Sequence, residues 1–185
     1  MSMLGISFLN EIVSKREITK PSQVLNELRI QVKNSLNQSG QKGDTHDGMD
    51  ISLCVINTNN LELQFAGAYN PLLIIRLKDL SEVEIIEIKA DRMPIGMHPK
   101  DNISFISTEF QLQKNDIFYI FSDGYHSQFG GIKNEKIKTC RFKDLLAENC
   151  KLPLKEQKQI LENEFNNWKG KNEQTDDVLV IGIKI

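Results

Sequence analysis

Apolar and polar side chains alternate with helical spacing over the first 38 residues. Apolar residues recur every three or four positions over residues 4–13, which predicts a first helix. A charged stretch follows, and Pro21 then marks a helix start, because proline fits the first turn, where backbone N–H groups have no helical partners. A second apolar stripe over residues 24–36 predicts a second helix.

The period changes from about 3.6 to two after a polar, glycine-containing loop at residues 41–49. Residues 51–55 and 61–65 alternate apolar with polar side chains, and the asparagine-rich turn between them predicts an antiparallel hairpin. Further strands are predicted at residues 72–77, 83–89, 103–112 and 117–122. Because no helix separates these strands and parallel pairing needs such crossovers, we expect antiparallel sheets.

The last third of the sequence predicts two helices and a final strand. The helices are expected at residues 142–149 and 154–169, with Trp168 in the apolar stripe of the second one. Residues 178–185 form an apolar run rich in β-branched side chains, which is typical of a strand buried on both faces in the middle of a sheet. With no repeat or linker in the chain, we expect one domain of α+β class over residues 1–185.

Composition narrows the class of function. The 185 residues contain 23 Lys and Arg against 25 Asp and Glu, and the net charge of −2 argues against a nucleic-acid-binding protein. No apolar run approaches the roughly 18 residues of a membrane helix, and the first residues do not form a secretion signal. Three cysteines without a CxxC pair indicate a reduced, cytoplasmic protein.

Acidic residues stand at the boundaries of two strong strands. Asp123 follows an apolar strand, and Gly124 lets the backbone turn sharply or a ligand approach. Asp176, followed by Asp177, precedes the last strand. If the two strands are antiparallel neighbours, Asp123 and Asp176 share one end of the sheet. Such carboxylates suit Mg²⁺ or Mn²⁺, and two of these ions can activate a water for attack on a phosphoryl group.

Structural explanations compete with each of these candidates. Ser-Asp-Gly is a common turn, and aspartate before a strand is a common loop residue. The stretch that contains Asp50 also suits a turn, although acidic loops next to strands often hold sites. The three histidines lack zinc-site spacing and are expected to be solvated loop residues, with a minor catalytic alternative for His126, near Asp123.

Seven short segments carry a resemblance to a known protein family through their joint order and spacing. They are DGMDISLC (47–54), FAGAYNPL (65–72), MPIG (93–96), YIFSDGY (119–125), QFGG (128–131), WKG (168–170) and QTDDV (174–178). With them, essentially the whole chain resembles the PPM-type (protein phosphatase 2C-like) serine/threonine phosphatases. The similarity is to the bacterial branch typified by the stage II sporulation protein E phosphatase domain.

The resemblance implies an αββα sandwich of two antiparallel sheets flanked by helices, and hydrolysis of phosphoserine and phosphothreonine with two Mn²⁺ or Mg²⁺ ions. It implies metal binding by Asp123 and Asp176, with Gly124, Asp177 and Asp50 as weaker candidates. The implied partner is a phosphorylated regulatory protein, in this branch often of the anti-anti-sigma type. An upstream sensor domain is compatible with this branch.

One departure from the family pattern affects the expected activity. The family carries a metal-bridging aspartate and a Gly-His-Gly segment before its first helix; here no aspartate precedes Asp44 and no Gly-His-Gly occurs. We therefore expect residues 1–185 to be the C-terminal majority of such a domain, without its N-terminal strands. With less negative charge between them, two divalent ions repel, so we expect weak binding of at most one ion and little turnover.

Two other interpretations stay open at the level of sequence. The first is a catalytically inactive PPM-like domain that serves as a regulatory or binding module. The second is an unrelated two-layer α+β binding protein, since such folds host many functions. A large separation between the carboxylates of Asp123 and Asp176 would end the argument for a metal site.

Overall fold

The computed structural model of the chain describes residues 2–38, 47–78, 82–100 and 102–185. These residues form two compact units, which are taken one at a time. Unit 1 comprises Met1–Leu72 and Ile88–Leu112, and unit 2 comprises Leu73–Glu87 and Gln113–Ile185. Of the loop predicted at residues 41–49, residues 41–46 lie outside the described ranges.

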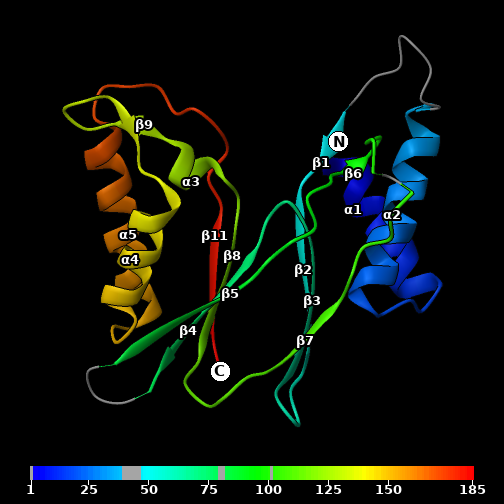
Figure 1. Cartoon of the computed structure of the whole chain (residues 1–185), viewed down its shortest axis with the longest axis horizontal. Helices are drawn as coiled ribbons and strands as arrows, with labels where there is room; N and C mark the ends of the chain where they lie inside the picture. Colours follow the sequence, from blue (N-terminus) through cyan, green and yellow to red (C-terminus); the bar gives the residue numbers. More distant parts are fainter. Residues whose placement is uncertain (1, 39–46, 79–81, 101) are drawn as a thin grey trace. The chain divides into compact units, whose positions relative to one another are not determined.

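The helices of unit 1 confirm the helical pattern at the start of the sequence. They are α1 (Ser2–Asn10), which continues into the π-helical turn η1 (Glu11–Lys15), and α2 (Pro21–Ser35). Pro21 occupies the first turn of α2, as predicted. The buried stripe of α2 includes Val24, Leu28 and Val32, which are at most 1% exposed. This stripe packs with Ala66 and Ala68 in one apolar cluster, so the helices cover one face of the unit 1 sheet (Figure 1).

The sheet of unit 1 contains the predicted hairpin. Its strands are β2 (Ile51–Asn57), β3 (Glu62–Ala68) and β7 (Thr108–Gln111), antiparallel in the order β2-β3-β7. The strand predicted at residues 103–112 is therefore shorter than expected. The reason is a competing set of partners: the Ile103 carbonyl accepts from Arg29 Nη2 at 2.8 Å, and the Phe105 N–H donates to Asn26 Oδ1 at 3.0 Å. Side chains of α2 thus hold this backbone outside the strand ladder.

Two of the short sequence motifs meet beside this sheet. The strands β1 (Gly48–Met49) and β6 (Ile95–Gly96) pair antiparallel, with Gly48 opposite Gly96. The Gln38 side chain, 5% exposed, joins the segments next to them. Its Nε2 donates to the Asp47 carbonyl at 2.7 Å, and its Oε1 accepts from the Met97 N–H at 2.9 Å. The DGMD and MPIG motifs therefore pair with each other as the two strands of one small sheet.

The sheet of unit 2 has the strand order β11-β8-β4-β5. Its strands are β4 (Leu72–Leu77), β5 (Val83–Ile88), β8 (Ile117–Phe121) and β11 (Val180–Lys184). The two late helices are α4 (Thr139–Asn149) and α5 (Leu154–Lys169), and α5 has the predicted bounds. Both helices cover one face of this sheet, where Tyr119, Phe142, Leu161 and Phe165 belong to one buried cluster (Figure 1).

Three short elements of unit 2 were not predicted. They are α3 (Gly124–Ser127), β9 (Phe129–Gly130) and β10 (Glu135–Lys136). Tertiary hydrogen bonds hold them: the Gly131 N–H donates to the Trp168 carbonyl at 2.8 Å, and Trp168 Nε1 donates to the Glu135 carbonyl at 3.1 Å. The QFGG and WKG motifs therefore meet at the end of α5. Elements of two to four residues carry too few positions for a periodic pattern to reveal them.

The prediction that the last strand is buried on both faces in the middle of a sheet is wrong. β11 stands at the end of the strand order, and β8 is its one partner among the described residues. Leu179, Ile181 and Ile183 are 55%, 39% and 39% exposed, whereas Val178 and Val180 pack against the cluster under α5. An apolar β-branched sequence is compatible with burial on both faces of a strand. It does not determine whether a second neighbouring strand or a covering layer is present to bury those faces.

The predicted α+β class with antiparallel sheets is confirmed by these two helix-covered sheets. Within the described residues, no helix is both long and apolar enough to span a membrane. The single-domain organisation over residues 1–185 stays a prediction.

Candidate functional site

The predicted pairing of the two strands that carry the acidic residues is confirmed. β8 and β11 are antiparallel, with Phe121 opposite Val180. Ser122 extends this pairing by one residue: its N–H donates to the Leu179 carbonyl at 3.0 Å, and its Oγ accepts from the Leu179 N–H at 2.9 Å. The same Oγ donates to the Asp177 carbonyl at 2.7 Å. The residue before Asp123 is thus hydrogen-bonded to the segment that follows Asp176.

Gly124 brings the two acidic segments into direct backbone contact. A Cβ atom at this position would lie 2.3 Å from the Asp177 carbonyl oxygen and 3.2 Å from that of Asp176. Real Cβ atoms do not approach backbone atoms so closely, so only glycine permits this packing. The structure therefore places the backbone of Asp123–Gly124 against that of Asp176–Asp177, as the sequence pattern predicts.

The aspartate side chains at this end of the sheet are exposed. Asp176 Oδ1 accepts from the Asp177 N–H at 2.7 Å, and the Asp176 carbonyl accepts from Gln174 Nε2 at 2.8 Å. The bond from the Asp177 N–H restricts the orientation of the Asp176 carboxylate, and the bond from Gln174 holds the backbone at the same residue. Asp50 is also exposed and lies between β1 and β2, in unit 1.

Whether these residues suit a divalent cation depends on the type and on the number of their ligand atoms. Carboxylate oxygens are the ligands that Mg²⁺ and Mn²⁺ prefer, so the type fits. The described residues contain no group of three or more His, Cys, Asp or Glu side chains that could hold a metal ion. Two carboxylates suit loose binding of one ion. The metal roles of Asp123 and Asp176, and the weaker ones of Gly124, Asp177 and Asp50, stay predictions.

His126 is not the solvated loop residue that we expected. It lies in α3, with its ring edge-on to Phe121 at 6.0 Å and stacked on Phe142 at 6.3 Å between ring centroids. Its Nδ1 is buried and has no hydrogen-bond partner. Burial lowers the pKa of His126 below its ordinary value, the negative charge of Asp123 opposes this shift, and the positive charge of Lys136 adds to it. Sequence spacing could not show this, because Phe142 comes from a different element.

The lowered pKa of His126 makes stability depend on pH. Below about pH 6.5, the unfolded chain binds a proton at His126 more readily than the folded chain does, so the free energy of unfolding falls as the pH drops through this range. We expect His126→Phe, which fills the same aromatic contact without the unpaired nitrogen, to be at least as stable as wild type and to lose less stability on acidification. Urea unfolding at pH 7.5 and pH 5.5 measures this, and identical pH responses would contradict it.

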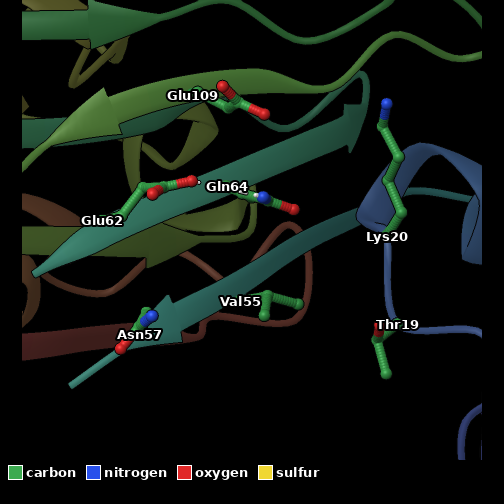
Figure 2. Close-up of a pocket in the computed structure, with 7 residues that line it drawn as sticks. All are labelled: Thr19, Lys20, Val55, Asn57, Glu62, Gln64 and Glu109. Carbon is green, nitrogen blue, oxygen red and sulfur yellow. Dashed lines mark hydrogen bonds between the residues drawn. The ribbon is translucent and has the colours of Figure 1, made fainter. Parts of the chain in front are cut away.

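Unit 1 contains a small polar pocket, and none of the candidate site residues from the sequence lines it (Figure 2). Its volume is about 410 Å³, and Glu62, Gln64 and Glu109 line it together with Lys20. The Glu62 carboxylate accepts from Asn60 Nδ2 and from Gln64 Nε2, both at 3.4 Å. The lining therefore combines charged, amide and hydroxyl groups, and no interaction among the described residues assigns it a ligand.

A larger apolar groove of about 850 Å³ lies in unit 2. Its walls come from α5 and β11, including Leu161, Phe165 and Val180, and it reaches Gln174, two residues before Asp176. The sequence predicted the apolar stripe of α5 but not this groove, because the groove depends on the position of β11 at the end of the sheet.

Comparisons with known proteins agree with this fold. The family model described as Stage II sporulation protein E (SpoIIE) matches residues 1–185. The SiaA-PP2C domain of Pseudomonas aeruginosa has a TM-score of 0.85 at 23% identity, over 99% of this chain and 68% of that chain. No curated protein matches the sequence.

Two structures from Bacillus subtilis are also similar. The PP2C phosphatase domain of SpoIIE with a fragment of its regulatory domain has a TM-score of 0.68 at 16% identity, over 98% of this chain and 48% of that chain. The manganese-presoaked SpoIIE phosphatase domain has a TM-score of 0.54 at 18% identity, over 88% and 70%. At these identities the likeness shows the fold alone.

The family match covers the whole sequence, and the chain therefore belongs to the SpoIIE family of PPM-type (PP2C-like) phosphatase domains. This confirms the resemblance indicated by the seven motifs. It excludes the alternative of an unrelated two-layer binding protein.

Proposed function

We propose that this chain is part of a metal-dependent protein serine/threonine phosphatase that removes phosphate from phosphoserine or phosphothreonine on a regulatory protein. The observation that carries the proposal is the contact between the Asp123–Gly124 and Asp176–Asp177 backbones at one end of the β8–β11 pair. It places two acidic residues of a phosphatase family at the same end of one sheet. An anti-anti-sigma-type substrate and a cytoplasmic location belong to this proposal as well.

The residues of this chain have separable roles in the proposed site. Asp123 and Asp176 would hold a Mn²⁺ or Mg²⁺ ion, which when bound lowers the pKa of a water and attracts a phosphoryl oxygen. Ser122 fixes the ends of the two strands level with each other through its bonds to Leu179 and Asp177. Gly124 leaves the space that lets the two acidic segments approach.

The 185-residue polypeptide itself is expected to have little activity. Its sequence contains no Gly-His-Gly, and its first aspartate is Asp44. Two acidic side chains offset less of the repulsion between two divalent ions than three would, so a two-ion site is unfavourable. We therefore expect one weakly bound ion.

A Mn²⁺ titration of the 185-residue polypeptide tests the proposal. We expect weak saturable binding, with the affinity lowered about tenfold or more in Asp123→Asn and in Asp176→Asn, because each loses a charged ligand. Asp144→Asn is the matched control, since Asp144 is an exposed aspartate of α4 in the same unit. Equal affinities in all four proteins would sink the metal-site proposal.

Hydrolysis of a phosphoserine peptide is measured on the same proteins. We expect little or no turnover by the 185-residue polypeptide. Clear Mn²⁺-dependent hydrolysis that Asp123→Asn abolishes would show that the bridging aspartate is dispensable, and would overturn the expectation of low activity.

A second candidate is an inactive PPM-like regulatory or binding module. The observation that favours it is the lack of a cluster of three or more metal-ligating side chains among the described residues. An absence of any saturable Mn²⁺ binding by the wild-type chain would favour this candidate over the enzyme.

A further inference from the structure

A second set of hydrogen bonds joins the segment around Asp123 to the segment around Asp176. It comes from Gln128, which follows α3, whereas Ser122 precedes α3. Gln128 directly follows α3, and its side chain is completely buried. Its Nε2 donates to the Glu173 carbonyl at 2.9 Å and to the Phe129 carbonyl at 3.0 Å. Its Oε1 accepts from the Thr175 N–H at 3.0 Å. One buried amide thus bonds to the backbone on both sides of residue 174.

The segment that Gln128 holds leads directly into Asp176. Residues 173–177 are all exposed and belong to no helix or strand. Within the part of the chain that the structure describes, the hydrogen bonds to this segment from outside it come from Gln128, at Glu173 and Thr175, and from Ser122, at Asp177. Because α3 is only four residues long, both anchors lie close in sequence to Asp123.

We propose that Gln128 is a positioning residue for the candidate metal site: its amide keeps the segment before Asp176 beside α3, so that Asp176 stays at the end of the β8–β11 pair where Asp123 lies. This inference rests on the proposed function, because it assigns Gln128 a role toward the ion that the two aspartates would share. Gln128 itself supplies no metal ligand, since both polar atoms of its side chain are bonded to backbone groups.

Removing the amide should release the segment. A methionine at position 128 has a similar length but leaves the Thr175 N–H and the Glu173 carbonyl without partners. These two hydrogen bonds are partly buried against the Gln128 side chain, and an unpaired backbone group costs free energy where water reaches it poorly, so the segment would shift to satisfy them. Ser122 would still hold Asp177, and the disturbance should therefore be centred on residues 173–176.

Gln157 offers a matched control in the same unit. Its side chain is 3% exposed, its Nε2 donates to the Leu152 carbonyl at 2.8 Å, and its Oε1 accepts from the Tyr119 hydroxyl. Gln157→Met therefore removes an equally buried amide that bonds to no residue of the 173–177 segment. A general loss of stability would affect both variants, whereas a positioning role belongs to Gln128 alone.

The test compares wild type, Gln128→Met and Gln157→Met as full 185-residue chains, by amide hydrogen exchange of Thr175 and by Mn²⁺ titration. We expect Gln128→Met to speed exchange at Thr175 about tenfold and to weaken Mn²⁺ binding about tenfold. Gln157→Met should leave both at wild-type values while lowering the melting temperature. If Gln128→Met does not fold, Gln128→Asn is used in its place. The shorter asparagine amide cannot reach both the Glu173 carbonyl and the Thr175 N–H.

The results separate two questions: whether Gln128 positions the segment, and whether the chain binds the metal that the proposed function needs. Wild-type exchange at Thr175 in the folded Gln128 variant, or equal effects in the Gln128 and Gln157 variants, would overturn the positioning role. If wild-type protein binds no Mn²⁺, the proposed function fails instead, and the exchange at Thr175 alone decides whether Gln128 holds the segment.

Discussion

Asp116→Ala is expected to lower the free energy of unfolding by about 3–5 kcal/mol, the usual cost of breaking a buried ion pair on one side. The Asp116 side chain is 2% exposed and its partner Arg76 is 15% exposed. Asp116 Oδ1 accepts from Arg76 Nε at 3.0 Å and Oδ2 from Nη2 at 2.7 Å, and Oδ2 also accepts from the Gln113 N–H at 2.8 Å. An arginine guanidinium stays protonated at neutral pH, so Asp116→Ala removes the bidentate carboxylate partner and leaves the positive charge of Arg76 in place.

Urea unfolding measures this loss, with Asp144→Ala as the control. Asp144 is exposed on α4, and its replacement should change stability by no more than about 0.5 kcal/mol. A combined Arg76→Met, Asp116→Leu variant should be more stable than Asp116→Ala, since it also removes the positive charge that has lost its carboxylate partner. A loss below about 1 kcal/mol for Asp116→Ala would show that water reaches the pair and replaces the carboxylate.

Gly124→Ala is the second change with a large expected effect. The added methyl group would meet the Asp177 carbonyl at 2.3 Å, and because this neighbour is backbone, a segment must shift to make room. We expect a loss of about 2–4 kcal/mol in the free energy of unfolding, within the range of strongly overpacked sites. Mn²⁺ binding should weaken as well, because the shift separates Asp123 from Asp176.

Gly170→Ala is the matched control for this prediction. Gly170 has a φ of +56°, and no atom lies within 4 Å of the place that an added methyl group would take, so alanine there meets backbone strain without a clash. That strain costs about 1–3 kcal/mol and should leave Mn²⁺ binding unchanged. If Gly124→Ala is no more destabilising than Gly170→Ala and binds Mn²⁺ normally, the close backbone contact does not constrain the site.

Elements with a long and regular pattern were predicted well from the sequence. The stripe over residues 154–169 gave a helix with the observed bounds, and the alternation around residues 51–65 gave the β2–β3 hairpin. The strand at residues 103–112 was overestimated because Arg29 and Asn26 compete for its backbone. That competition comes from a helix about 75 residues away, and no local pattern contains it.

The candidate site was only half visible in the sequence. Asp123 and Asp176 were proposed as metal ligands because each follows or precedes a strong strand, and the seven motifs indicated the family. Gln128 and the pairing role of Ser122 were missed, although both lie in those motifs, because their hydrogen bonds go to residues 173–179. His126 was misjudged for the same reason, since Phe142 supplies part of its buried surroundings.

The sequence by itself determined the α+β class, the family, and the two acidic strand ends, because these depend on local periodicity and on short ordered motifs. The tertiary structure alone decided that β11 lies at the end of its sheet, that Gly124 packs on Asp177, and that Gln128 holds the segment before Asp176. The physical reason is that these features are contacts between residues about 45 to 67 positions apart. Such contacts form only when burial and hydrogen bonding in the folded chain offset the entropy of closing long loops.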